Sequence, residues 1–199
     1  MNFPNALTLA RIILIFVFII LAANAGGIAE DFNSSHVLRL VAYLVAVVAA
    51  LTDLADGYFA RKWNQITDFG KLMDPLADKI FVAGIMLIMV EYQLLPAWVA
   101  VVIISREFLV TGLRMLALQK NTVIAADIWG KIKTVLQMLM MGVGGLAWVG
   151  LFDMHFGTVA GISTWTIWTI SLYFISAITI WSGLGYFVKY KKLYINSLS

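Results

Sequence analysis

The sequence contains no cysteine and unusually few charged residues. Without cysteine, the chain cannot form disulfide bonds, thiolate metal sites or a cysteine nucleophile. Charged residues make up only 13% of the 199 residues, against about 25% in soluble domains. Hydrophobic residues make up 62%, against about 45 to 50%. This composition excludes an ordinary water-soluble globule and indicates a protein of the lipid bilayer.

Six apolar stretches are long enough to cross a bilayer as helices, because a hydrocarbon core about 30 Å thick needs about 20 residues per helix. They run approximately from Leu7 to Ala23, Val37 to Ala60, Phe69 to Val90, Leu95 to Leu118, Ile132 to Phe152 and Trp165 to Val188. The period-two alternation that indicates strands is absent, so we expect none. The sequence predicts one all-α integral membrane domain over residues 1–199, with six transmembrane helices.

Basic residues lie mainly at alternate ends of these six stretches. In membrane proteins, lysine and arginine are enriched on the cytoplasmic side. Arg39 is the only basic residue at the opposite ends, which also carry Glu30, Asp31, Glu91 and both histidines. We therefore expect both termini in the cytoplasm. The net charge of +3 reflects this bias and does not indicate affinity for nucleic acid.

Four aspartates lie within the predicted second and third helices. Asp53 and Asp56 are three residues apart and Asp74 and Asp78 are four apart, so each pair shares one helical face. An antiparallel hairpin of the two helices would bring both pairs together. Each charge at the centre of a span costs about 2.5 to 3.5 kcal/mol, so the carboxylates need a cationic partner. Carboxylate oxygens suit Mg²⁺ or Mn²⁺, and the four predict two adjacent divalent ions.

Small residues and one arginine accompany these aspartates in a fixed order. The segment from Asp53 to Asp78 reads D-x2-D-G-x2-A-R-x8-G-x3-D-x3-D. This pattern resembles, without departure, the signature of the CDP-alcohol phosphotransferase family. Members of that family are membrane enzymes that transfer a phosphatidyl or related group from a CDP-linked donor to an alcohol.

The resemblance implies six transmembrane helices around a polar cavity that faces the cytoplasm. It implies that Asp53, Asp56 and Asp74 hold the metal ions, and that Asp78, a further ligand at their edge, accepts the proton of the attacking alcohol. The residues expected to bind the CDP-linked donor are Asn5, Thr8, Asp56, Gly57, Ala60, Arg61 and Gly70. Asn5 and Thr8 have a competing interpretation as a helix cap. Homodimerisation is implied by the family resemblance alone.

A second group of polar residues lies in the cytoplasmic halves of the predicted fourth and fifth helices. Arg106 and Arg114 are eight residues apart, a little over two turns, so both can face one cavity. Two arginines beside Glu107 within a span cost too much to be membrane anchors only, so a phosphate on the acceptor is the expected partner. Lys131 and Lys133 lie on nearly opposite sides of the fifth helix. The predicted acceptor site comprises Arg106, Arg114, Lys131, Lys133 and Thr134.

Four segments, PNALTLAR, DPLADK, REFLVTGLR and GKIKT, resemble the bacterial branch of this family that makes phosphatidylglycerophosphate, over nearly the whole chain. That resemblance implies a multi-pass enzyme of the bacterial plasma membrane that uses CDP-diacylglycerol as donor and glycerol 3-phosphate as acceptor. An inositol phosphate acceptor fits the charges equally well. A cation or proton carrier, the alternative from another class, fits the aspartates but not Arg61, Arg106 and Arg114.

Overall fold

The computed structural model describes residues 3–26, 32–62, 68–120, 127–151, 157–159 and 161–191. Side chains are described throughout these ranges except at residues 3–5, 32–34, 53–62, 68–72 and 74. The described chain forms six long helices and one short hairpin. The elements are α1 (Phe3–Ala23), α2 (Phe32–Lys62), α3 (Asp68–Glu91), α4 (Ala97–Gln119), α5 (Ile128–Val149), β1 (Thr158–Val159), β2 (Ile162–Ser163) and α6 (Thr164–Lys189).

Each helix covers one of the six apolar stretches predicted from the sequence. The largest difference in bounds is at α2, which begins at Phe32, five residues before Val37. Helix α5 begins at Ile128 instead of Ile132, so the whole GKIKT segment is helical. Hydropathy detects the apolar part of a helix, whereas the helix itself continues into the polar residues on either side. The prediction of helical structure is therefore confirmed. Helices α1, α2, α3 and α6 are longer than their predicted stretches, whereas α4 begins two residues later than predicted, after Pro96, and α5 ends three residues earlier.

The expectation that the chain has no strands is wrong at residues 158–163. Strands β1 and β2 pair antiparallel, with Thr158 opposite Ser163 and Val159 opposite Ile162. Gly161 has a φ of 81°, a left-handed conformation that glycine adopts without steric cost and that tight turns require. Period-two alternation is recognisable only over about four residues or more, so two-residue strands leave no such signal.

Four of the described helices, α1, α2, α5 and α6, contain a stretch long and apolar enough to cross a membrane. Helix α4 differs because the charged residues Arg106, Glu107 and Arg114 interrupt its apolar sequence. Helix α3 carries Asp74 and Asp78 in its first half. With 24 and 23 residues, α3 and α4 are still long enough, at about 1.5 Å per residue, for a core about 30 Å thick. Charged residues within α3 and α4 therefore set these two helices apart from the four more continuously apolar stretches.

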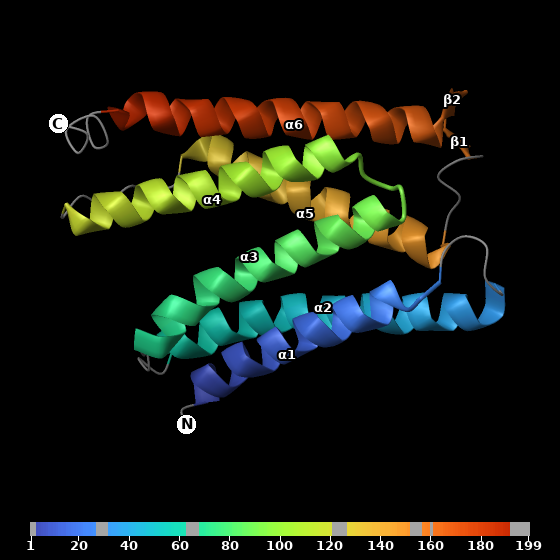
Figure 1. Ribbon diagram of the computed structural model, residues 1–199, viewed down its shortest axis with the longest axis horizontal. Helices are drawn as coiled ribbons and strands as arrows, with labels where there is room; N and C mark the ends of the chain where they lie inside the picture. The colour runs from blue at the N-terminus through green and yellow to red at the C-terminus, as the bar shows by residue number, and fades with distance from the viewer. Residues whose placement is uncertain are drawn as a thin grey trace. The chain divides into compact units, whose positions relative to one another are not determined.

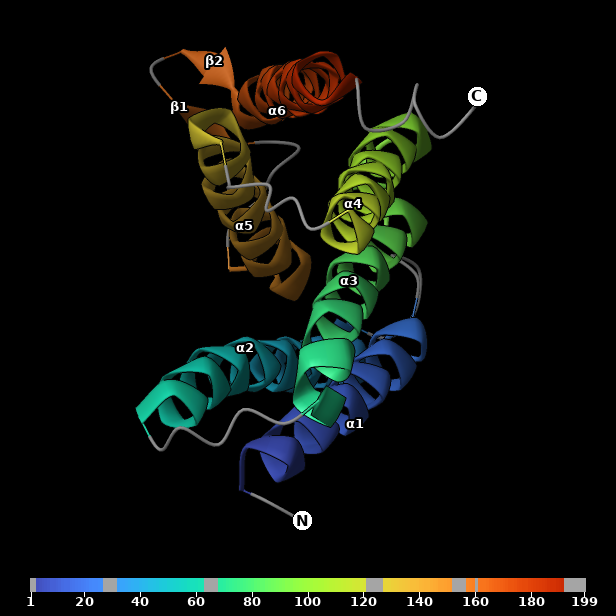
Figure 2. The same cartoon turned by 90° about the vertical axis from the view of Figure 1, so that its left-hand side faces the viewer.

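The chain packs as two compact units. The first comprises Met1–Leu94 with Gly145–Leu151, and the second comprises Leu95–Gly144 with Phe152–Ser199. In the first unit, α1 runs antiparallel to α2 and parallel to α3 and packs against both (Figure 1). In the second unit, α4 packs along α6, and the hairpin adjoins the first turn of α6 (Figure 2).

The core of the first unit is a contact between α1, α2 and α3 through Ile15, Ala49 and Ala77, which are at most 1% exposed. Alanine at two of the three positions allows the helix backbones to approach closely. A second close approach lies farther along α3, where a Cβ at Gly84 would lie 2.9 Å from Cδ1 of Ile19 in α1. Small residues therefore set the spacing of α1 against its neighbours, as is common between helices in membranes.

Candidate functional site

The predicted metal ligands lie on the two helices that pack against α1. Asp53 and Asp56 belong to the last third of α2, and Asp74 and Asp78 to the first half of α3. Among them, only Asp78 has a described side chain, and it is exposed. The predicted site residues whose side chains lie outside the described part are Asn5, Asp53, Asp56, Gly57, Ala60, Arg61, Gly70 and Asp74.

The contact of Ala49 and Ala77 with α1 fixes which faces of α2 and α3 carry the aspartates. Asp53 follows Ala49 by four residues and Asp74 precedes Ala77 by three, so each lies within about 60° of an alanine that faces α1. Asp78 comes one residue after Ala77 and is turned by about 100° from it. Asp74 and Asp78, four residues apart, are about 40° apart around the α3 axis and share one face, and Asp78 is the one turned farther from the contact with α1, in agreement with its exposed side chain.

Thr8 and Arg11 are buried polar residues on the face of α1 that carries Ile15. They are 1% and 3% exposed. Because α1 runs antiparallel to α2 and parallel to α3, one turn from Ile15 toward Arg11 leads to the level of Asp53 and Asp74 (Figure 1). A permanently charged guanidinium is therefore buried on the face of α1 that packs against α2 and α3.

The helix-cap interpretation of Asn5 and Thr8 is wrong. Helix α1 begins at Phe3, so both residues lie inside it. A capping residue stands at the boundary, with non-helical backbone angles, and its side chain bonds to the first free amides. Thr8 is 1% exposed, so it lies in the interior of the first unit and not at a helix boundary.

In the second unit, Arg106 and Arg114 of α4 converge on one aromatic ring of α6. The guanidinium carbon of each arginine lies 5.7 Å from the centroid of the Tyr186 ring. Arg114 Nη2 also donates a hydrogen bond to the Tyr186 hydroxyl at 3.2 Å. Arg106 Nη2 donates to the hydroxyl of Ser182, one turn earlier on α6, at 2.7 Å. Both arginines therefore contact the same side chain of α6, as their spacing of eight residues allows.

Lys133 of α5 reaches the same region through Glu107. The Lys133 ammonium and Arg106 Nη1 both pair with Oε1 of Glu107, the latter at 3.2 Å. Lys133 is 1% exposed, so its charge is removed from solvent and compensated by this carboxylate. Arg106, Glu107 and Lys133 thus form one ion network that joins α4 to α5.

The other two predicted acceptor residues lie elsewhere on α5. Lys131 and Thr134 are both exposed, and the Thr134 hydroxyl donates to the carbonyl oxygen of Gly130 at 2.9 Å. Adjacent positions on a helix point in different directions, so Lys131 and Thr134 cannot share the face of Lys133. The cation cluster of the second unit, defined here as Arg106, Arg114 and Lys133, contains three of the five predicted residues.

The contribution of α6 to this cluster was not predicted from the sequence. Ser176, Thr179, Ser182 and Tyr186 are all at most 3% exposed and are spaced by three or four residues. Polar residues at helical spacing in an otherwise apolar span indicate a face turned toward protein. That periodicity was available in the sequence and would have identified Ser182 and Tyr186 as interior residues.

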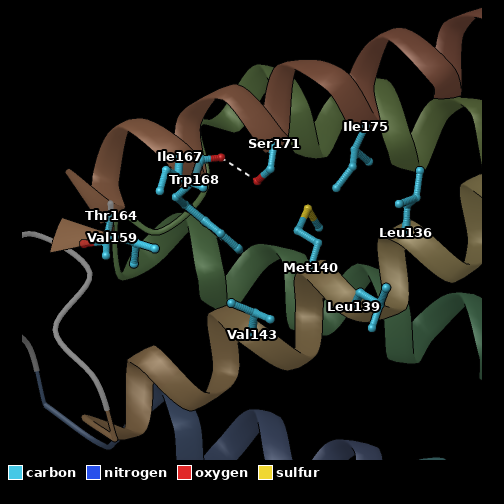
Figure 3. Close-up of a pocket in the computed structure, with 10 residues that line it drawn as sticks. All are labelled: Leu136, Leu139, Met140, Val143, Val159, Thr164, Ile167, Trp168, Ser171 and Ile175. Carbon is cyan, nitrogen blue, oxygen red and sulfur yellow. Dashed lines mark hydrogen bonds between the residues drawn. The ribbon is translucent and has the colours of Figure 1, made fainter. Parts of the chain in front are cut away.

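The second unit also contains a cavity of about 330 Å³ between α5 and α6 (Figure 3). Its lining is mainly apolar, with Met140 and Trp168 among the residues that point into it (Figure 3). The hydroxyl of Ser171 donates to the carbonyl oxygen of Trp168 at 2.7 Å. The chemistry of this lining suits hydrocarbon and is unsuited to a phosphate or a metal ion.

Comparison with known proteins identifies relatives along nearly the whole chain. The family described as CDP-alcohol phosphatidyltransferase matches residues 1–181. A Bacillus subtilis (strain 168) protein named CDP-diacylglycerol--glycerol-3-phosphate 3-phosphatidyltransferase is 40% identical over 192 residues, 94% of each chain. Proteins of that name from Haemophilus influenzae and Rickettsia bellii are 36% and 34% identical, over 93% and 97% of this chain and 91% and 97% of their own. The chain therefore belongs to the CDP-alcohol phosphatidyltransferase family.

Proposed function

We propose that this protein transfers the phosphatidyl group of CDP-diacylglycerol to glycerol 3-phosphate, with phosphatidylglycerophosphate and CMP as products. The relatives named above support this donor and this acceptor. The observation that carries the proposal is the cation cluster of Arg106, Arg114 and Lys133, which gathers positive charge from α4 and α5 in a largely apolar protein. Such a cluster suits an acceptor that already bears a phosphate and suits serine or an amino alcohol poorly.

The four aspartates fit a divalent metal site by their chemistry. They are hard oxygen donors, and the chain has no cysteine to favour a softer metal. In this proposal, Asp53, Asp56, Asp74 and Asp78 hold two ions, Mg²⁺ or Mn²⁺. When bound, such ions would neutralise the donor pyrophosphate and the charge that develops as CMP leaves.

The reaction then needs one bond formed, one bond broken and one proton moved. The acceptor hydroxyl oxygen attacks the phosphorus that carries the diacylglycerol, and the bond from that phosphorus to the CMP oxygen breaks. CMP leaves with the bonding electrons, and Asp78 takes the hydroxyl proton. The Asp78 side chain is exposed and lies about one helical turn beyond Asp74, and this exposure supports its role as a base that a second substrate can reach.

The donor and the acceptor use different residues of the chain. Arg61 provides a fixed cationic fork for donor phosphate oxygens, and Gly57, Ala60 and Gly70 leave room beside the nucleotide. Thr8 and Arg11 line the same level of the first unit. Arg106, Arg114 and Lys133 bind the phosphate of the acceptor and leave its hydroxyl to react.

The membrane arrangement follows from helix length and charge. All six helices span the bilayer, with both termini and the aspartates on the cytoplasmic side of a bacterial plasma membrane. This orientation agrees with the positions of the basic residues. A homodimer is expected from the family.

An acceptor screen tests the proposal directly. Purified protein in lipid vesicles receives CDP-diacylglycerol and Mg²⁺ together with glycerol 3-phosphate, inositol phosphate, glycerol or serine, and CMP release is measured beside labelled lipid. We expect glycerol 3-phosphate to give the highest kcat/KM. CMP release with inositol phosphate alone would show that inositol phosphate is the acceptor. Ion flux without CMP release would show that the protein is an ion carrier and not this enzyme.

A further inference from the structure

Tyr186 lies at the centre of the contacts that organise the cation cluster. Its side chain is 3% exposed, and its ring contacts the guanidinium groups of both Arg106 and Arg114. The Tyr186 hydroxyl accepts hydrogen bonds from Arg114 Nη2 at 3.2 Å and from the backbone amide of Asp127 at 2.8 Å. One side chain of α6 therefore contacts two cations of α4 and the segment that leads into α5.

These contacts hold two positive charges, the guanidinium groups of Arg106 and Arg114, close together despite their mutual repulsion. Two guanidinium groups on flexible side chains repel each other and, in water, would adopt many orientations. The π-face of an aromatic ring attracts cations, so the buried ring of Tyr186 can hold both the largely buried Arg106 and the exposed Arg114. The hydroxyl adds a directional hydrogen bond, which fixes the orientation of the Arg114 guanidinium as well as its position.

The same part of α6 restricts Arg106 in two further ways. Ser182 accepts a hydrogen bond from Arg106 Nη2, and Gly183 provides space for the stem of that side chain. A Cβ at Gly183 would lie 3.2 Å from Cγ of Arg106, closer than side chains normally approach. Helix α6 thus combines a hydrogen-bond acceptor, a gap and an aromatic ring around one arginine.

We propose that Tyr186 is a positioning residue for the acceptor: it pre-orients Arg106 and Arg114 so that both point at the phosphate of the incoming polyol phosphate. This inference rests on the proposed function, because it assigns Tyr186 to the acceptor side of that reaction. Groups held in place before binding spare the substrate the entropic cost of ordering them. Loss of Tyr186 therefore weakens acceptor binding more than donor binding.

A purely structural role makes a different prediction. Tyr186 also packs with Val110 and Leu113 of α4, so truncation of the ring could simply loosen α4 from α6. That would lower the stability of the protein and affect both substrates alike. Tyr186→Phe keeps the ring and this packing but removes the hydroxyl, so it separates the two roles.

The test compares Tyr186→Phe, Tyr186→Leu and Ser182→Ala with the wild type in vesicles. Tyr173→Phe is the control, since Tyr173 is 60% exposed on the same helix. Measured quantities are kcat, KM for glycerol 3-phosphate, KM for CDP-diacylglycerol, the inhibition constant of inorganic phosphate, and the thermal unfolding temperature. We expect Tyr186→Phe to raise the acceptor KM and the phosphate inhibition constant about tenfold, and Tyr186→Leu to raise them further, with donor KM unchanged.

Several outcomes would overturn the inference. One is an unchanged KM for glycerol 3-phosphate in Tyr186→Phe, and the other is an equal rise in the KM values for glycerol 3-phosphate and CDP-diacylglycerol in that variant. If Tyr186→Leu does not fold, Tyr186→Phe and Ser182→Ala carry the test alone. Failure of the proposed function looks different, because the wild type itself would then release no CMP with glycerol 3-phosphate.

Discussion

Lys133 of α5, only 1% exposed, pairs with the carboxylate of Glu107 in α4. The same carboxylate contacts Arg106, so one negative charge balances two positive ones. Removal of one partner from a buried pair leaves an uncompensated charge, which is more costly than the absence of both. Glu107 is therefore expected to maintain the helix contact between α4 and α5 as well as the charge of the cluster.

Glu107→Gln should lower the free energy of unfolding by about 1 to 3 kcal/mol, since the Glu107 side chain is partly exposed. A double-mutant cycle with Lys133→Met measures the coupling, with denaturant unfolding in mild detergent as the assay. The double variant should be less destabilised than the sum of the two single variants. Strict additivity would mean that the pair contributes nothing, and Glu91→Gln at the exposed end of α3 serves as the control.

Asp78→Asn should lower kcat at least about 100-fold, because the amide cannot accept the proton of the acceptor. Binding of CDP-diacylglycerol, measured by titration, should remain. Asp56→Asn should instead abolish metal-dependent donor binding. Normal turnover by Asp78→Asn would show that another group takes the proton.

Arg114→Ala should raise the KM for glycerol 3-phosphate at least about tenfold and leave the donor KM nearly unchanged. Arg114 donates to Tyr186 and carries one of three cations of the cluster. Lys120→Ala, a change at an exposed residue just beyond α4, is the matched loss of charge and should affect neither KM. An equal rise in the KM values for glycerol 3-phosphate and CDP-diacylglycerol in Arg114→Ala would show that Arg114 does not belong to the acceptor site.

Tyr92→Phe should lower the free energy of unfolding by about 0.5 to 1.5 kcal/mol without changing kcat or either KM. The buried Tyr92 hydroxyl donates to the carbonyl oxygen of Ala22 at 2.7 Å and joins the end of α3 to the end of α1. Tyr92 lies at the opposite end of α3 from Asp74 and Asp78, so the loss is structural. A fall in kcat together with normal stability would contradict this assignment, and thermal unfolding beside CMP release provides both measurements.

The sequence predicts both Lys131 and Lys133 for the acceptor site but does not distinguish between them. The sequence shows that the two lysines lie on nearly opposite faces of one helix, but it does not show which face meets other helices. Contact with Glu107 identifies Lys133 as the buried residue and leaves Lys131 exposed. Charge and spacing alone treat the two lysines as equal.

Tyr186 illustrates what sequence reasoning missed. A tyrosine near the end of a transmembrane helix is usually explained by the membrane interface, where aromatic residues are enriched. Its contact with two arginines joins α4 and α6 across more than 70 residues of chain. Local patterns cannot report such a contact, because it depends on how helices pack.

The amino-acid sequence by itself determined the membrane location, the six helices and the order of the aspartates, because hydropathy and helical periodicity are local properties of the chain. The tertiary structure decided which cations meet, which tyrosine lies between them and which face of α1 is buried. Those outcomes depend on the contacts that form when helices distant in sequence pack together, and in this protein small residues such as Ala49, Ala77 and Gly183 set how closely the helices approach.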